Sequence, residues 1–151
     1  MLNKMTTKED LIKDSLRLFP SGYRPANFTD PDHCEECRDH NETLLGTTRE
    51  AITFNELGNP GWDPICFVNE AGFKYYFPAL VRLALTGYGD EYYITQFLFH
   101  ITQNANCTGF SKNQSEFVVK VLEFLIENRS AELDMFLESD DVLNAIELWS
   151  G

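Results

Sequence analysis

The sequence predicts an all-α fold, a single-domain irregular bundle of about six or seven helices around a central helix bent by a proline. Three observations lead to this prediction. The stretch from Asn69 to Leu85 repeats its apolar residues with a helical period, several shorter stretches are amphipathic in the same way, and no convincing alternation of apolar and polar residues indicates a strand. The 151 residues contain no internal repeat, low-complexity tract or linker, so residues 1–151 are expected to form one domain.

The central helix is predicted from one continuous apolar stripe. Its members lie three and four residues apart: Phe73, Tyr76, Phe77, Leu80, Val81 and Ala84. Further apolar side chains cover much of the remaining circumference, so we expect this helix to be buried on several sides, with Asn69 or the residue before it as its cap. Pro78 removes one backbone donor inside the stretch, which predicts a kink between two half-helices.

The other expected helices are located by their start and stop signals. Small polar residues that can accept a hydrogen bond from the first turn precede the amphipathic stretches: Thr6 or Thr7, Asp30 or Asp32, Thr53 with Glu56 as a capping box, Asp90, and Ser111. Breaks are predicted at Pro20 to Gly22, Gly46, Gly58 to Pro64, Gly87 to Gly89 and Asn104 to Gly109. Two short helices near Ala131 to Leu137 and Asp140 to Trp149 complete the chain, and Trp62 is expected to pack against the core.

Negative charge is concentrated in two segments of the chain. The net charge is −12, and residues 27–46 hold six acidic residues against one arginine, while residues 130–151 hold six against no base. Such a surface repels nucleic acid and anionic lipid and attracts a basic protein partner. The candidate partner-binding residues are Glu35, Glu36, Asp39, Asp134, Asp140 and Asp141. A surface that serves only solubility is the alternative interpretation.

Membrane insertion and export are not predicted. No apolar run reaches the roughly 18 residues that a transmembrane helix needs, and the polar stretch from Met1 to Asp10 lacks the apolar core of a signal peptide. The expected location is therefore the cytoplasm.

Potential metal or redox ligands gather in one place, from His33 through Cys34 and Cys37 to His40. A Cys-x-x-Cys pair supplies half of a typical zinc site. On one helix His33 and His40 are separated by about 10 Å along the axis, so one ion cannot readily bind both. A complete zinc site would then need a further ligand from elsewhere: Cys66, Cys107 or His100.

Two other interpretations of the cysteine pair compete with zinc. Thiol redox chemistry requires a low thiol pKa, which a helix N-terminus favours, but the neighbouring carboxylates of Asp32, Glu35, Glu36 and Asp39 are expected to disfavour a thiolate. No βαβ pattern indicates a thioredoxin-like fold either. We favour the third interpretation, in which Cys34 or Cys37 is a small buried side chain of an amphipathic helix.

Established catalytic patterns are absent from the sequence. It contains no glycine-rich phosphate loop, nucleophile elbow, H-E-x-x-H helix or EF-hand loop. His100 follows the apolar run Phe97 to Phe99 and is expected to be a hydrogen-bonded core histidine rather than a base. The sequence therefore predicts a protein that is not an enzyme.

Two segments resemble a family of small bacterial proteins of unknown function. The family has an H-C-x-E-C element and a downstream E-A-F-x-Y-Y-L-P-A-like helix, which correspond to His33 to Cys37 and to Glu70 to Leu80. The second segment departs from the pattern by the inserted Gly72 and by Phe77 in place of leucine. The resemblance implies a compact helical domain and assigns no catalytic residue.

The leading functional hypothesis is an acidic cytoplasmic protein that binds another protein. Bacterial immunity proteins, which are small and acidic and neutralise basic toxins, offer an analogy of size and charge without a shared motif. The expected partner is thus a basic protein such as a toxin domain, bound without a cofactor. The competing hypothesis is a zinc-binding or thiol-dependent protein centred on Cys34 and Cys37.

Overall fold

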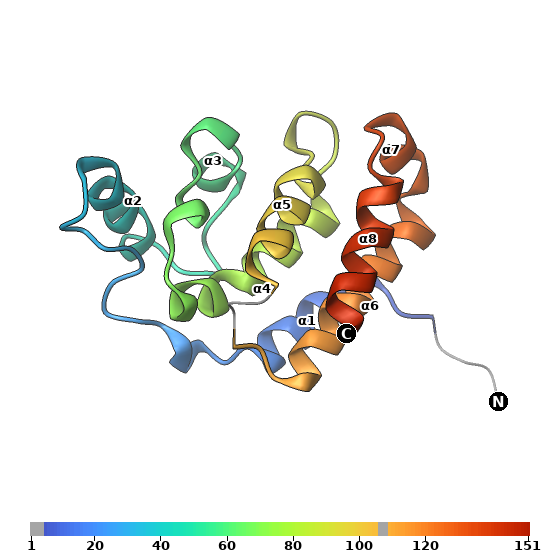
Figure 1. The fold of residues 1–151 in the computed structure, drawn as a ribbon, viewed down its shortest axis with the longest axis horizontal. Helices are drawn as coiled ribbons and strands as arrows, with labels where there is room; N and C mark the ends of the chain where they lie inside the picture. Colours follow the sequence, from blue (N-terminus) through green and yellow to red (C-terminus); the bar gives the residue numbers. More distant parts are fainter. Residues whose placement is uncertain (1–4, 106–108) are drawn as a thin grey trace.

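The structure is a computed structural model that describes residues 5–105 and 109–151 (Figure 1). Within these ranges the chain forms eight α-helices and no strand, which confirms the all-α prediction. The helices are α1 Lys8–Leu18, α2 Glu35–Leu45, α3 Phe54–Leu57, α4 Glu70–Thr86, α5 Ile94–Asn104, α6 Lys112–Asn128, α7 Ser130–Met135 and α8 Ser139–Ser150. Short 3-10 turns connect them: η1 Ser21–Tyr23, η2 Pro60–Trp62, η3 Pro64–Phe67 and η4 Gly89–Glu91.

Helix α4 is the buried centre of the bundle, as predicted. Twelve of its 17 residues are buried, and it packs against α1, α5 and η1. Asn69 caps it, because its side-chain oxygen accepts the Gly72 N–H at 2.7 Å. Helix α4 continues through Pro78 as one helical element, and the kink expected at this residue stays a prediction. Contacts on all sides hold the helix together where the proline removes a single donor.

The helices follow one another in a row along the long axis of the molecule. Figure 1 shows α2 at one end, α7 and α8 at the other, and α3 and α5 between them. Helix α8 packs against both α5 and α6. The segments 27–46 and 130–151, which carry most of the excess negative charge, therefore lie at opposite ends of the molecule.

Three helices begin with reciprocal capping boxes. Their pairs are Thr7 with Asp10 in α1, Thr53 with Glu56 in α3, and Ser111 with Gln114 in α6. In each pair the first side chain accepts a backbone N–H from the first turn, while the second side chain accepts the N–H of the capping residue. The predicted starts at Thr7, Thr53 and Ser111 are thus confirmed.

Three local predictions were wrong. Helix α2 is capped by Cys34 rather than by Asp30 or Asp32, because these aspartates belong to a turn in which the His33 N–H bonds the Asp30 carbonyl. Asp90 lies in η4, and α5 follows Tyr93, which makes no side-chain cap. Trp62, expected to pack against the core, is 45% exposed and contacts the buried ring of His40 rather than the apolar core cluster. Cys107 lies outside the described residues.

Among the residues that the structure describes, none of the helices has the length and apolar character that crossing a bilayer requires.

Candidate functional site

The first candidate site is formed by His33, Cys34 and Cys37 at the start of α2. Cys34 has an extended backbone (φ −164°, ψ 170°), and its Sγ accepts the Cys37 N–H at 3.2 Å. This arrangement places the two Sγ atoms 3.0 Å apart. The Nδ1 atom of His33 lies 3.5 Å from Cys37 Sγ. The ligand atoms of the three residues all lie within 4.8 Å of one another.

The two thiols of this cluster differ in acidity. Hydrogen bonds from the Cys37 thiol, then from the Cys37 backbone N–H and from His33, lower the pKa of Cys34 to about 7. The pKa of Cys37 is raised to about 11, first by Cys34, then by burial and by the charges of Asp30 and Glu36. Of the carboxylates expected to disfavour a thiolate, only Glu36 adds to the raised pKa of Cys37, after Cys34 and burial, while hydrogen bonds to the sulfur lower the pKa of Cys34.

His40 does not join this cluster. It is fully buried, and its ring lies 4.6 Å from the Trp62 ring and 4.9 Å from the Phe67 ring, measured between centroids. Its Nε2 atom is 3.4 Å from a carboxylate oxygen of Glu36. Of the four residues predicted as metal ligands, the structure therefore brings together His33, Cys34 and Cys37 and leaves His40 outside.

A second cluster joins Asp63, Cys66 and His100, whose ligand atoms also lie within 4.8 Å of one another. The Asp63 carboxylate accepts the Ile65 N–H at 3.0 Å, the Gln96 side-chain amide at 2.9 Å and His100 Nε2 at 2.7 Å. The expectation of a hydrogen-bonded core histidine at position 100 is confirmed, since His100 is only 1% exposed. Burial and the Asp63 charge raise the pKa of Cys66 to about 11.

The third candidate is an apolar surface on α5, α7 and α8, called here the α5/α7/α8 surface. Its large side chains are exposed to solvent: Phe99, Met135, Phe136, Leu137, Leu143 and Leu148. A pocket of about 600 Å³ is lined by Phe99 and Phe136 among others. A second pocket of about 370 Å³ is lined by Phe99 and Leu148. Because Phe99 lines both pockets, they adjoin each other at this side chain.

Two contacts of Tyr92 join the segment before α5 to the end of α7. The Tyr92 ring stacks on the Phe136 ring with 4.2 Å between centroids and 10° between planes. The Tyr92 hydroxyl donates to Glu138 Oε1 at 2.6 Å, and burial, followed by this carboxylate, raises the pKa of Tyr92. Phe136 is therefore held in place although it is 47% exposed.

Leu137 has an unusual backbone for its residue type. Its φ is +58°, and it ends α7 with two hydrogen bonds, from the Leu137 N–H to the Asp134 carbonyl and from the Glu138 N–H to the Leu133 carbonyl. This helix ending normally uses glycine, since a left-handed residue with a side chain costs about 1–2 kcal/mol. Leu137 is also 87% exposed, so its side chain buries little apolar area that could offset this cost.

The six acidic residues predicted to bind a partner divide into two groups. Glu35, Glu36 and Asp39 lie on α2. Asp134 lies on α7, and Asp140 and Asp141 lie in the first turn of α8. Since these helices are at opposite ends of the molecule (Figure 1), no single contact surface includes both groups. Exposed apolar side chains occur near both groups: Trp62 and Phe67 contact His40 of α2, whereas the more exposed Met135 and Leu137 lie close in sequence to the second group.

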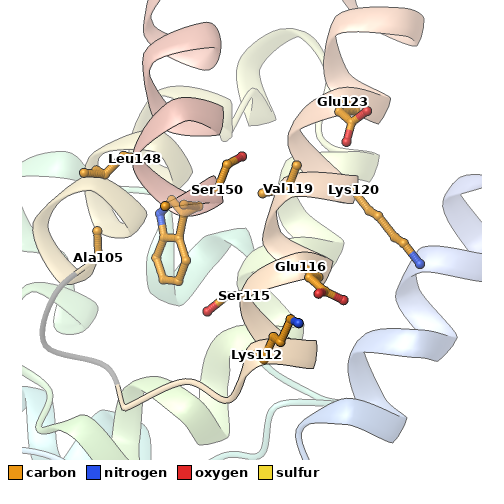
Figure 2. A pocket seen from close by; sticks show the side chains of 11 residues that line it. Ala105, Lys112, Ser115, Glu116, Val119, Lys120, Glu123, Leu148 and Ser150 are labelled. Atoms are coloured by element: carbon orange, nitrogen blue, oxygen red, sulfur yellow. The ribbon is translucent and has the colours of Figure 1, made fainter.

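A larger pocket, of about 770 Å³, lies between α6 and α8 (Figure 2). Figure 2 shows two lysines and two glutamates of α6 at its border: Lys112, Glu116, Lys120 and Glu123. Their charges balance, and the side chains from α8, such as Ser150, add no ionisable group. The pocket therefore offers no preferred ligand charge and no group of metal ligands.

Comparison of the chain with protein-family models, with curated proteins and with solved structures found no match. The resemblance to small bacterial proteins therefore stays a prediction based on His33 to Cys37 and Glu70 to Leu80. Fold and sites together define an all-α protein with a thiol–histidine cluster at one end and an apolar, acid-rich surface at the other.

Sequence reasoning missed two of these features. It did not join Asp63 to His100, because 37 residues separate them and only the tertiary fold brings α5 to η3. It did not identify the α5/α7/α8 surface, although Met135, Phe136 and Leu137 are three consecutive large apolar residues. Such a run in a short polar segment is the signal that could have indicated exposure.

Proposed function

We propose that this protein is not an enzyme and acts by binding a basic, amphipathic segment of another protein on its α5/α7/α8 surface. The observation that carries the proposal is the exposure of six large apolar side chains beside a purely acidic stretch of chain. Extended apolar patches of this kind on a folded protein typically mark interaction sites. The proposed binding needs no cofactor.

The backbone of Leu137 supports this proposal. A leucine that is 87% exposed, with φ at +58°, destabilises the folded chain where glycine would not. Its side chain therefore does not add to the stability of the fold. Met135 and Phe136, its neighbours in sequence, are also exposed.

The negative charge of the surface favours a partner with basic side chains. From Ser130 to Gly151 the chain has six carboxylates and neither lysine nor arginine. A partner with basic side chains on both sides of an apolar stripe would place the stripe along Phe99 and Phe136 and its charges near Asp140 and Asp141. Opposite charge also accelerates association at low salt. A basic toxin domain, the partner implied by the analogy with immunity proteins, has this chemistry.

Charge reversal tests which end of the molecule binds. The probe is a fluorescent helical peptide of lysine and leucine, and its binding is measured by fluorescence anisotropy. Asp140→Lys with Asp141→Lys should weaken binding at least tenfold, whereas Glu35→Lys with Asp39→Lys, an equal charge change on α2, should leave most of the affinity. Equal losses in both variants would show that only net charge attracts the peptide, and the proposed surface would be wrong.

Substitution of Leu137 separates binding from stability. Leu137→Gly should raise the free energy of unfolding by about 1 kcal/mol, because glycine adopts a positive φ without strain. The same variant should bind the peptide more weakly, because the apolar surface is smaller. Urea denaturation and anisotropy measure the two effects. A variant that gains stability and keeps full affinity would remove Leu137 from the proposed surface.

A further inference from the structure

We infer that His33, Cys34 and Cys37 bind a single zinc ion, with the fourth coordination position open to solvent. This site lies at the α2 end of the molecule and is independent of the proposed docking surface at α5, α7 and α8 (Figure 1).

The distances between the ligand atoms fit a tetrahedral ion. With Zn–S bonds of about 2.3 Å and Zn–N bonds of about 2.0–2.1 Å, tetrahedral geometry places sulfur about 3.5 Å from nitrogen and two sulfurs about 3.8 Å apart. The observed separation of Cys37 Sγ from His33 Nδ1 is 3.5 Å. The Sγ atoms of Cys34 and Cys37, at 3.0 Å, need to separate by less than 1 Å. Rotation of the Cys34 side chain, which precedes the helix, provides this change.

The electron pairs needed for coordination are not committed elsewhere. In the part of the chain that the structure describes, the hydrogen bonds of these three side chains run only to one another and to the Cys37 N–H. An ion would therefore replace contacts within the cluster and break none with the core. Two sulfurs and an imidazole are also the donor set that zinc prefers among the common divalent ions.

The loop that carries His33 is fixed against α2 without any metal. The Asn41 side-chain oxygen of α2 accepts the N–H groups of Phe28 and Thr29, at 2.7 and 3.2 Å. The Thr29 hydroxyl donates to the Cys37 carbonyl at 2.6 Å. These buried bonds hold the loop and the first turn of α2 together, so the ligands are largely positioned before an ion arrives.

Zinc alone is the probe for this site. The reduced, metal-free full-length protein is titrated with Zn²⁺ in competition with a chromogenic chelator, and Co²⁺ is used in parallel to detect thiolate-to-metal absorption. The expected result is one ion per chain. Because His33 is exposed in a turn, His33→Ala keeps the fold, and it should weaken zinc binding about tenfold or more.

Two cysteine variants show which of the two clusters binds the zinc ion. Cys34→Ser with Cys37→Ser should abolish stoichiometric zinc binding and the cobalt–thiolate absorption, while circular dichroism confirms that the helices remain. Cys66→Ser, the matched loss of a thiol in the second cluster, should still bind one ion. The inference is overturned if the reduced wild-type chain takes up no stoichiometric zinc, or if the double variant binds it as well as the wild type. It is also overturned if His33→Ala leaves the affinity unchanged.

Discussion

Two clusters in this protein both contain histidine and cysteine and differ in how these side chains are used. Each holds one histidine and at least one cysteine, with ligand atoms within 4.8 Å of one another. In the first, His33, Cys34 and Cys37 contact mainly one another at the edge of the molecule. In the second, Asp63 and His100 are buried and hydrogen-bonded. The difference teaches that closely spaced ligand atoms do not by themselves make a metal site. Their electron pairs must also be free of hydrogen bonds to the rest of the fold.

The second cluster serves the fold. Asp63 caps η3 through the Ile65 N–H and also accepts hydrogen bonds from Gln96 and His100 on α5. The Gln96 amide donates further to the Leu57 carbonyl, so the same network reaches α3. A metal ion here would have to displace hydrogen bonds that join three elements, which opposes binding.

The largest expected effect comes from removing the shared acceptor of the second cluster. Asp63→Ala should lower the free energy of unfolding by about 3 kcal/mol or more, because it leaves several buried donors without a partner. For a chain of this size that corresponds to a fall in Tm of about 6 to 12 °C. Urea and thermal denaturation measure it. His33→Ala, the control in the first cluster, should leave both quantities unchanged; equal losses in the two variants would abolish the distinction between the clusters.

The next effect is stabilisation by zinc through the first cluster. At a free zinc concentration about one hundred times Kd, the ion should raise the Tm of the reduced protein by about 5 to 10 °C, because it binds the folded chain preferentially. Addition of a chelator should reverse the shift. The Cys66→Ser variant should show the full shift and Cys34→Ser with Cys37→Ser none. A shift that depends on Cys66 instead would assign the metal to the second cluster.

The fold was largely predictable because its signals are local. The apolar stripe of α4 and the capping boxes at Thr7, Thr53 and Ser111 each depend on residues within one or two helical turns. The cap of α2 was not predictable in the same way. Asp30 and Asp32 are better capping residues than Cys34 by propensity, and only the turn that they form with His33 removes them from that position.

The candidate sites were predictable only in part. The helical spacing of His33 and His40 disfavoured a shared ion; the structure agrees for another reason, since His33 lies in the turn before α2 and the His40 ring packs against Trp62 and Phe67. The contact of Asp63 with His100 depends on tertiary packing and has no local signal. Likewise, the sequence shows two acidic segments, but which apolar side chains lie exposed beside each of them depends on how the bundle is assembled.

A smaller effect should distinguish the thiols by their reactivity. In metal-free protein the pKa of Cys34 is lowered to about 7, so Cys34 is a thiolate at pH 8, whereas Cys66, with its pKa raised to about 11, remains protonated until much higher pH. The thiolate fractions then differ by about a thousandfold, and the weaker nucleophilicity of a low-pKa thiolate offsets about a hundredfold of this. Cys34 should react about tenfold faster with iodoacetamide.

Mass spectrometry of peptides after timed alkylation measures this difference. The rate at Cys34 should rise with pH and level off above about pH 8, while the rate at Cys66 should still be rising at pH 9. Added zinc should protect Cys34 and Cys37 and leave Cys66 unprotected. Equal rates at Cys34 and Cys66 across this range would mean that the start of α2 does not activate its thiol.

The smallest expected effect is that of Cys66→Ser on stability, within about 0.5 kcal/mol of the wild type. The Cys66 residue is exposed as a whole although its sulfur is partly desolvated, and Asp63, Gln96 and His100 are hydrogen-bonded to one another without it. Serine should therefore leave the network intact, and urea denaturation should give nearly the same midpoint. A loss comparable to that of Asp63→Ala would show that the thiol is part of the network. The second cluster would then be a three-residue unit like the first, and only the burial of its histidine would still distinguish the two.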